Sequence, residues 1–180
     1  FLPMKCLVVS DSRGLMGELV VLHERHKDEV DLFIHCGDSE LTRDDQVIQY
    51  YKTVQGNCDF GDDFPEDLTA QLEDWSIFVT HGHLYNIKST LMNISYKGRE
   101  VGANIVCFGH SHIAGAEKID NCLYINPGSI RLPRGSQYKS YVILEKQGQN
   151  AIVDFYTLDG EKLQGWQLKT TLKKKKKKLY

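Results

Sequence analysis

The chain has 180 residues, of which 41% are hydrophobic and 26% charged, a balance typical of a globular domain that buries its own core. No apolar run approaches the length of a membrane span and no signal peptide is recognisable, so we expect no membrane partner. The formal net charge is −2 although residues 173–178 are all lysine, so the body is acidic and excludes a long nucleic-acid partner, which would require a basic surface.

The ends of the chain differ in composition from its body. Phe1–Pro3 precede Met4, which we expect to be the natural start. We expect one domain over residues 4–168, followed by a lysine-rich tail over residues 169–180 that is disordered or not native. The five cysteines show no paired spacing, and four of them lie in apolar, strand-like runs. Their pattern favours a reducing, cytoplasmic location and no disulfide framework.

The first third of the chain alternates strand and helix patterns. Short β-branched runs predict strands over residues 5–10, 31–35 and 52–55. Apolar residues at helical spacing predict helices over residues 14–27 and 44–51. Strands that alternate with helices in this way are typical of a wound α/β sheet.

The remainder of the chain is richer in strands. Two neighbouring strands are predicted over residues 68–72 and 76–80, then a helix over 88–101 and an apolar strand over 104–108. Four further strands, separated by turn signals, are predicted over residues 116–119, 123–126, 140–145 and 151–158. Two packed sheets with helices outside them would bury both parts of this α/β chain.

Polar blocks with metal-binding side chains stand at the ends of five of these apolar runs. The blocks are Asp11-Ser12-Arg13, Gly37-Asp38, Gly56-Asn57-Cys58-Asp59, His81-Gly82-His83 and Gly109-His110-Ser111-His112. Because α/β sites form outside the carboxyl ends of the strands, we expect the blocks to converge. Carboxylate, amide oxygen and imidazole suit borderline divalent ions such as Mn²⁺, Fe²⁺, Ni²⁺ or Zn²⁺. A shared carboxylate with ligands on either side is how two-metal hydrolytic sites are built.

Each block also has an ordinary structural explanation. Asp11 and Asp38 are residues of the type that caps helices, and Asn57 tolerates the left-handed geometry of a turn. The pair His110 and His112 is the strongest single indication, since two imidazoles two residues apart can reach one locus from an irregular turn. The joint presence of five blocks favours the metal site.

In their order, the blocks resemble the calcineurin-like metallophosphoesterases, and most closely the small bacterial and archaeal phosphodiesterases of the YfcE-like branch. Residues 35–38 and 126–129 also fit that branch, and the resemblance extends from residue 4 to about residue 158. It implies a four-layer α/β/β/α sandwich of two mixed β-sheets flanked by helices. It also implies a metal-dependent phosphodiesterase that hydrolyses a small phosphodiester.

The resemblance further implies roles for individual residues. Asp38 would bridge two divalent ions, Mn²⁺ being favoured over Ni²⁺, Fe²⁺, Zn²⁺ or Mg²⁺. The first ion would be held by Asp11 and His112, and the second by Asn57, His81 and His110. A hydroxide bridging the ions would attack phosphorus in line while the cations absorb the developing charge.

The chain departs from the family pattern at Arg13, where relatives have histidine. A guanidinium has no lone pair for a metal, so three outcomes stay open. Water completes the first site, the first ion binds weakly or is absent, or Arg13 contacts the substrate phosphate together with Asn57. We expect a dinuclear site whose first ion is the weaker.

Two further positions bear on proton transfer and phosphate binding. Cys58 stands where many relatives have a histidine that protonates the leaving group, which implies a weaker general acid. His83 is a candidate general acid or phosphate contact, with a supporting hydrogen bond as its alternative role. Arg131 and Arg134 are candidate phosphate contacts, or solvated loop residues.

A second class of function competes with the enzyme. A retromer subunit shares this fold with a degraded metal site, and Arg13 is the feature that would favour such a binding scaffold here. Six of the seven expected ligands remain, which favours the enzyme. The sequence is compatible with a homo-oligomer and leaves the substrate undefined.

Overall fold

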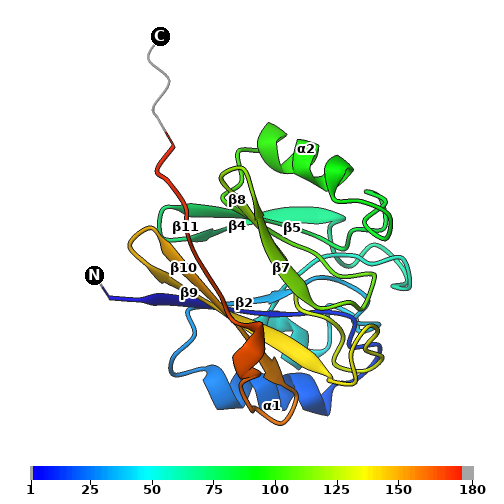
Figure 1. Cartoon of the computed structure of the whole chain (residues 1–180). Coiled ribbons are helices and arrows are strands. Elements are labelled where there is room, and N and C mark those ends of the chain that lie inside the picture. The colour runs from blue at the N-terminus through cyan, green and yellow to red at the C-terminus, as the bar shows by residue number, and fades with distance from the viewer. Residues whose placement is uncertain (1, 176–180) are drawn as a thin grey trace.

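Two mixed β-sheets pack face to face in the computed structural model, which describes residues 2–175 (Figure 1). The first sheet has the order β11-β10-β9-β1-β2-β3 and the second the order β4-β5-β6-β8-β7. The strands of the first sheet are β1 (Met4–Val9), β2 (Leu32–His35), β3 (Lys52–Thr53), β9 (Ser140–Gln147), β10 (Asn150–Thr157) and β11 (Leu168–Thr171). Those of the second are β4 (Asp67–Leu72), β5 (Trp75–Thr80), β6 (Ile105–Cys107), β7 (Gly115–Ile119) and β8 (Cys122–Asn126).

Helices cover the outer face of each sheet. Helix α1 (Gly17–His26) and the 3₁₀ turn η1 (Gln46–Tyr50) pack on the first sheet, and α2 (Met92–Glu100) lies over the second (Figure 1). A second 3₁₀ turn, η2 (Gln164–Trp166), precedes β11. The predicted four-layer α/β/β/α sandwich is therefore confirmed.

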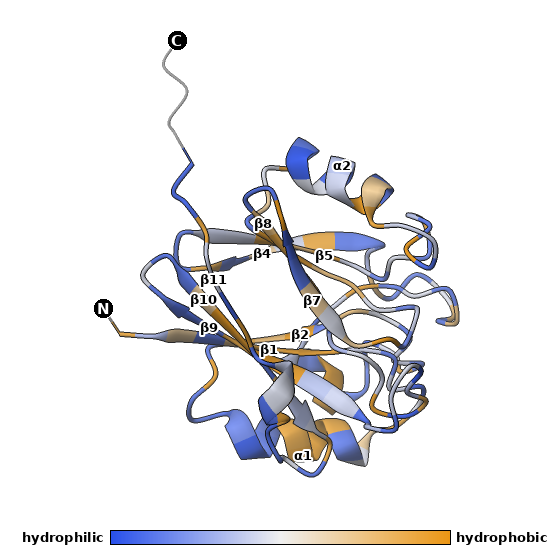
Figure 2. Ribbon diagram, in the orientation of Figure 1, coloured by the Kyte–Doolittle hydropathy of each residue, from blue (hydrophilic) through white to orange (hydrophobic). Residues whose placement is uncertain are grey.

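Three apolar clusters hold the layers together. The largest lies between the sheets and contains fully buried residues such as Val8, Ile77 and Ile125. The others lie beneath α1, around Leu22, and beneath α2, around Ile94. Burial of each such side chain contributes about 1.5–3 kcal/mol, so these clusters are the main favourable contribution to folding. In Figure 2 hydrophobic residues gather on the central strands, whereas α2 is largely hydrophilic.

Parallel pairing brings the ends of the central strands to one edge. Strand β1 pairs in parallel with β2, and β5 pairs in parallel with β6. Because parallel strands point the same way, the polar residues that follow them collect on one side of the molecule, at the right in Figure 1.

Some predicted elements have different limits in the structure. The helix predicted over residues 44–51 is the five-residue 3₁₀ turn η1, because Tyr51 is already extended and Lys52 begins β3. The helix predicted over 88–101 begins only at Met92, since Asn86 is left-handed (φ 53°) and the segment before Met92 forms turns. The helix predicted from residue 14 begins at Gly17 for the same reason, Gly14 having φ 88°.

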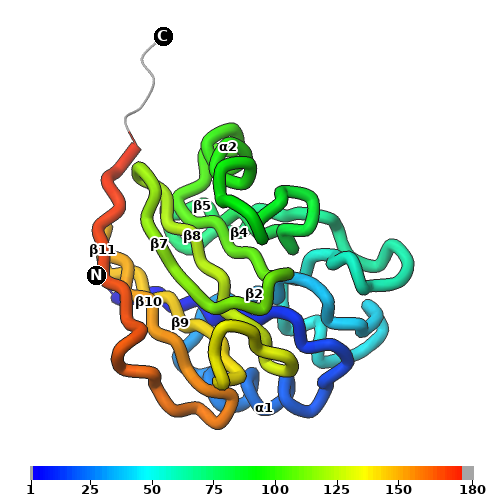
Figure 3. The backbone as a smooth tube through the Cα atoms, turned by 45° about the vertical axis from the view of Figure 1, so that its right-hand side comes forward, coloured from blue at the N-terminus to red at the C-terminus, as the bar shows by residue number. Residues whose placement is uncertain are grey.

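The tail predicted from residue 169 is wrong for its first residues. Residues Leu168–Thr171 form β11, which pairs antiparallel with β10 (Figure 3). The side chain of Leu172, which follows, is fully buried. The Lys173 N–H donates to the Asn121 side chain at 2.8 Å, so the chain is fixed at least that far. An edge strand of alternating Leu, Lys and Thr carries too weak an apolar signal to be distinguished from a polar tail. The lysines from residue 176 onward lie outside the described residues.

Among the described residues, no helix combines the length and apolar character needed to cross a bilayer.

Candidate metal centre

Three of the five polar blocks contribute turns of one unusual kind. They are Asp11-Ser12-Arg13, Asp38-Ser39-Glu40 and His110-Ser111-His112. In each turn both outer residues are left-handed, with φ between 48° and 69°, and the central serine is buried. A non-glycine residue in this conformation costs on the order of 1–3 kcal/mol, and such strain clusters at functional sites. The repeated turn therefore marks the converged strand ends as a site.

Asp11, Asp38 and His81 form the buried centre of this site. Their ligand atoms all lie within 4.8 Å of one another. The Nε2 atom of His81 is 3.2 Å from Asp38 Oδ2 and 3.8 Å from Asp11 Oδ1. Carboxylate and imidazole ligands this close are a suitable set for a divalent ion.

The hydrogen bonds of His81 fix which nitrogen faces the carboxylates. Its Nδ1–H donates to the Cys36 carbonyl at 2.8 Å, which leaves the lone pair of Nε2 directed at two carboxylates. Both His81 Nε2 and Asp11 Oδ1 are buried without a well-aligned hydrogen-bond partner among the described residues. Acceptors that face one another in a buried site need a proton or a cation between them, so the residues present fit a metal ion.

His112 repeats the arrangement on the other side of Asp11. Its Nδ1–H donates to the Leu132 carbonyl at 2.7 Å, and its Nε2 lies 3.2 Å from Asp11 Oδ1. Metal-ligating histidines commonly donate their second N–H to a carbonyl, which fixes the ring and its tautomer. His81 and His112 both meet this criterion.

His110 and Asn57 form a more open part of the site. His110 Nδ1 lies 3.1 Å from Asn57 Oδ1, and the His110 ring centroid is 5.1 Å from that of His81. Burial, assisted by the charges of His81 and Lys88, lowers the pKa of His110 to about 4. The ring is therefore neutral near pH 7 and has a lone pair to offer a cation.

Asp38 is held as an anion by its neighbours. Burial favours the neutral acid, but the adjacent His81 and the Cys58 N–H, which donates to Oδ1 at 2.8 Å, more than offset it. Together they lower the pKa of Asp38 to about 2. The carboxylate is thus ionised across the working pH range of most enzymes.

Asp59 joins two of the polar blocks. Its carboxylate accepts the backbone N–H groups of Gly56 at 2.7 Å, Glu40 at 2.8 Å and Asp38 at 3.0 Å. Asp59 therefore positions Asp38 against the turn that bears Asn57. A role for Asp59 beyond its place beside Cys58 could not be predicted from the sequence, because its three donors come together only once the chain is folded.

Other positioning residues come from distant parts of the chain. Ser10 Oγ donates to Asp11 Oδ2 at 2.6 Å, and Ser129 Oγ donates to the Asp11 carbonyl at 2.8 Å. Asn126 Nδ2 donates to Ser111 Oγ at 3.0 Å, and His35 Nε2 lies 2.8 Å from Ser12 Oγ. The resemblance included residues 126–129 and 35–38 without assigning these bonds.

The structure places Arg13 beside the carboxylates without making it part of their cluster. Its Nε–H donates to Glu40 Oε2 at 3.0 Å, and this contact raises the pKa of the guanidinium. Arg131 donates to the Arg13 carbonyl at 3.1 Å and thereby braces the same turn. Arg13 supplies a fixed positive charge at the rim of the site rather than a ligand.

His83 lies next to the cluster. Its ring centroid is 5.4 Å from that of His81 and 6.1 Å from that of His110. Its Nδ1 is buried and has no hydrogen-bond partner within the described chain. Burial and the charge of His81 lower the pKa of His83, so the imidazole is neutral at pH 7.

We expect metal and protons to compete at His81 and His112. In the metal-free chain, burial lowers the pKa of His81, but Asp38 and Asp11 raise it by more, so the net shift is upward. The contact with Asp11 likewise raises the pKa of His112. A raised pKa stabilises the fold below the unfolded value of about 6.5, and this contribution is lost as the pH rises through the folded value. With chelator, the melting temperature should therefore fall as the pH rises from below to above the unfolded value of about 6.5, and added Mn²⁺ should reverse the fall.

The measurement is thermal unfolding with chelator and with Mn²⁺ across that range. The stabilisation by Mn²⁺ should grow with pH in the wild type. In His112→Gln the stabilisation should be smaller than in the wild type. Stabilisation by Mn²⁺ that does not change with pH would contradict the competition.

Comparison with known proteins agrees with this geometry. Residues 4–149 match the calcineurin-like phosphoesterase superfamily domain. The probable metallophosphoesterase YsnB of Bacillus subtilis strain 168 is 48% identical over 169 residues, which cover 94% of this chain and 100% of that protein. Phosphodiesterase YfcE of Escherichia coli K12 is 31% identical over 111 residues, covering 56% of this chain and 55% of YfcE.

A solved structure shows the same likeness. The crystal structure of a predicted phosphoesterase from Streptococcus pneumoniae TIGR4 superposes with a TM-score of 0.91 at 33% identity, covering 95% of this chain and 99% of that one. All five polar blocks fall within the matched domain. The resemblance found in the sequence is confirmed, and the chain belongs to the calcineurin-like phosphoesterase superfamily, in its small YfcE-like branch of metal-dependent hydrolases that act on phosphoester bonds.

Proposed function

We propose that the protein is a phosphodiesterase that hydrolyses a small phosphodiester at the cluster of Asp11, Asp38 and His81. The observation that carries the proposal is the approach of His81 Nε2 to Asp11 Oδ1 at 3.8 Å, with Asp38 beside them and both atoms buried without a well-aligned hydrogen-bond partner in the described part of the chain. In the metal-free site, protons are needed between these imidazoles and carboxylates, and a divalent cation can replace them.

The ligands divide into two groups around Asp38. We assign Asp11 and His112 to a first ion and Asn57, His81 and His110 to a second, with Asp38 shared by both. The distances given above support this division, since His112 approaches Asp11 while His110 approaches Asn57. Mn²⁺ is the ion we favour at both positions. When bound, divalent ions supply an activated water for in-line attack and offset charge on the phosphoryl oxygens.

The chain's own side chains would then bind the substrate and handle its proton. Glu40 holds the Nε–H of Arg13, so the terminal Nη groups are the part of the guanidinium offered to a phosphate. Asn57 Nδ2 lies 3.6 Å from Cys58 Sγ, a weak contact that a phosphate oxygen can replace. His83 is neutral and only a weak acid, so esters with good leaving groups should react fastest.

The proposed function also bears on the partners and the location of the protein. We propose a small phosphoester as the substrate and neither a long nucleic acid nor a membrane as a partner. The proposed function is compatible with a homo-oligomer. We place the protein in the cytoplasm, a proposal supported by its five free cysteines, four of which are buried.

Hydrolysis of bis-p-nitrophenyl phosphate by metal-stripped protein, titrated with Mn²⁺, tests this function. We expect no turnover in chelator and turnover that rises and saturates with Mn²⁺. Folded protein that binds no metal and shows no turnover with any of the five candidate ions would favour the binding scaffold.

Replacement of Arg13 by histidine should strengthen the weaker ion site. An imidazole offers a lone pair where the guanidinium has none, so we expect the affinity of that site for Mn²⁺ to rise about 10–100-fold. Loss of the phosphate contact should lower kcat/KM at saturating Mn²⁺ by about tenfold. Calorimetric titration and steady-state kinetics measure the two effects.

Arg13→Leu is the matched control, because it removes the charge and offers no lone pair to a metal. It should show the kinetic loss without the gain in affinity. Equal Mn²⁺ affinity in Arg13→His and the wild type would show that residue 13 is not a ligand position of this site.

A further inference from the structure

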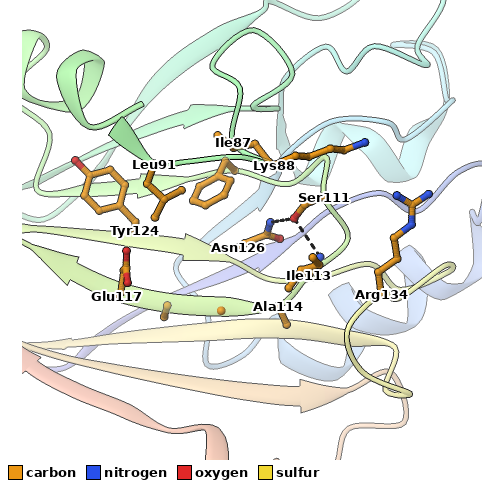
Figure 4. A pocket seen from close by; sticks show the side chains of 13 residues that line it. Ile87, Lys88, Leu91, Ser111, Ile113, Ala114, Glu117, Tyr124, Asn126 and Arg134 are labelled. Carbon is orange, nitrogen blue, oxygen red and sulfur yellow. Dashed lines mark hydrogen bonds between the residues drawn. The ribbon is translucent and has the colours of Figure 1, made fainter. Parts of the chain in front are cut away.

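An apolar groove lies directly beside the turn that carries His110 and His112. Its volume is about 490 Å³, within the range of small-molecule sites. Figure 4 shows its lining, which includes Ile87, Leu91, Phe108, Ile113 and Tyr124.

The groove shares a wall with the proposed metal centre. Ser111 lines it and stands between His110 and His112 in the sequence, and Asn126 holds Ser111 in place at 3.0 Å (Figure 4). Phe108 and Ile113 continue this wall on either side of the turn. A ligand whose phosphate reached the two imidazoles would therefore have its remaining atoms over the groove.

Charge is distributed unevenly along the groove. Lys88 and Arg134 lie at the end near Ser111, whereas Tyr124 and Glu117 lie at the other end (Figure 4). Arg134 lies directly beside the ligand turn, since its backbone N–H donates to the His112 carbonyl at 3.0 Å, and Lys88 lines the same groove. This polarity suits a ligand with an anionic group at one end and an apolar body.

The apolar side chains are also accessible. Ile113 is 53% exposed even though it follows His112 directly in the chain. Gly115 leaves the groove open at its strand, because a Cβ built there would meet no atom within 4 Å. An exposed apolar surface that is rimmed by charge and continuous with a catalytic centre is typical of a ligand site.

We propose that this groove binds the organic group of the phosphodiester, and that this group is apolar and at least as large as an aromatic ring, with the phosphate held between the metal centre and the Lys88–Arg134 end. The proposal rests on the proposed function and adds a substrate class to it. Small polar alcohols would leave the groove unfilled and bind less well.

Two phosphonates with the same charged head test the groove. We would measure the Kd values of phenylphosphonate and methylphosphonate for Mn²⁺-loaded protein by calorimetry. Removal of a phenyl ring from water should make phenylphosphonate bind about tenfold tighter or more. A ratio near one in the wild type would overturn the proposal without any variant.

A pair of glycine variants localises the effect. Gly115→Phe should fill the groove and bring the ratio of the two Kd values close to one, because the added ring occupies free space at the edge strand β7. Gly165→Phe, at a remote glycine with equally free space, should leave the ratio unchanged. A phenyl preference that survives in folded Gly115→Phe would overturn the groove as its source.

Failure of the groove and failure of the hydrolytic function are distinguishable. Phosphodiester turnover without a phenyl preference would overturn the groove proposal alone. A phenyl preference that Gly115→Phe abolishes, without turnover of any phosphodiester, would support the groove and overturn the hydrolytic function.

Discussion

Asp38→Asn is expected to reduce Mn²⁺-dependent hydrolysis of bis-p-nitrophenyl phosphate by about 10³-fold or more. In the structure the Asp38 carboxylate faces His81 with Oδ2 and accepts the Cys58 N–H with Oδ1. An asparagine keeps an oxygen for Cys58 but presents an NH₂ group to the metal position, and this group cannot bind a cation. Loss of about 4 kcal/mol of transition-state stabilisation corresponds to this factor.

The measurement combines kcat/KM at saturating Mn²⁺ with calorimetric metal titration. Asp154→Asn is the matched control, because Asp154 lies on β10 and pairs with Lys162 at 3.5 Å, away from the metal centre. The control should keep wild-type turnover and metal binding. A loss below about tenfold in folded Asp38→Asn would remove Asp38 from the shared-ligand position.

The convergence of the polar blocks could be predicted because it depends on short-range patterns. Buried strands such as β1 and β5 are largely apolar runs, and polar residues follow each one directly. Parallel pairing then places Asp11 beside Asp38 at one edge of the first sheet and His81 beside His110 at one edge of the second, as the pattern of strands predicts. The five strands of the second sheet could also be predicted from the sequence, apart from their exact limits.

The contacts that set the chemistry could not be predicted from these patterns. His81 is oriented by the carbonyl of Cys36, which is 45 residues away, and Arg13 by Glu40, which is 27 residues away. Such partners are chosen by how the turns pack, and no local preference encodes them. The departure at Arg13 was visible in the sequence, but Glu40 as its partner was not.

The left-handed turns were invisible for a different reason. Left-handed conformations are uncommon for any residue except glycine, and although Asp and His adopt them more often than most residues, nothing local singles out Asp11, Asp38 and His110. Surrounding hydrogen bonds, such as those from Ser129 to the Asp11 carbonyl, hold them in place. The structure therefore adds both the strain and its supports, which sequence patterns do not contain.

Gly56→Ala should both destabilise the protein and disable the site. A Cβ at this position would overlap Asp38 Oδ1 and lie 2.5 Å from the Asp38 backbone nitrogen. Rotation of the Asp38 side chain cannot relieve the contact between the new Cβ and the Asp38 backbone nitrogen. The backbone N–H groups of Asp38 and Gly56 are also held together, because both donate to one carboxylate oxygen of Asp59. The two turns must therefore separate, which we expect to cost about 1–3 kcal/mol of unfolding free energy.

Separation of these turns moves Asp38 relative to Asn57, so activity should fall even under conditions where the variant is fully folded. A displacement of about 1 Å in a catalytic group can lower turnover about 10²-fold, and we expect a fall of that size in Mn²⁺-dependent kcat/KM. Denaturant unfolding and kinetics at a temperature where the variant is folded measure the two effects separately.

Gly17→Ala is the matched control for Gly56→Ala. Gly17 begins α1, and a Cβ there meets no atom within 4 Å, so the change should preserve activity and raise stability by up to about 1 kcal/mol. Wild-type activity in Gly56→Ala would mean that the turn around Asn57 moves freely relative to Asp38. The site would then tolerate variable spacing between its ligands, and Asp59 would have no role in positioning them.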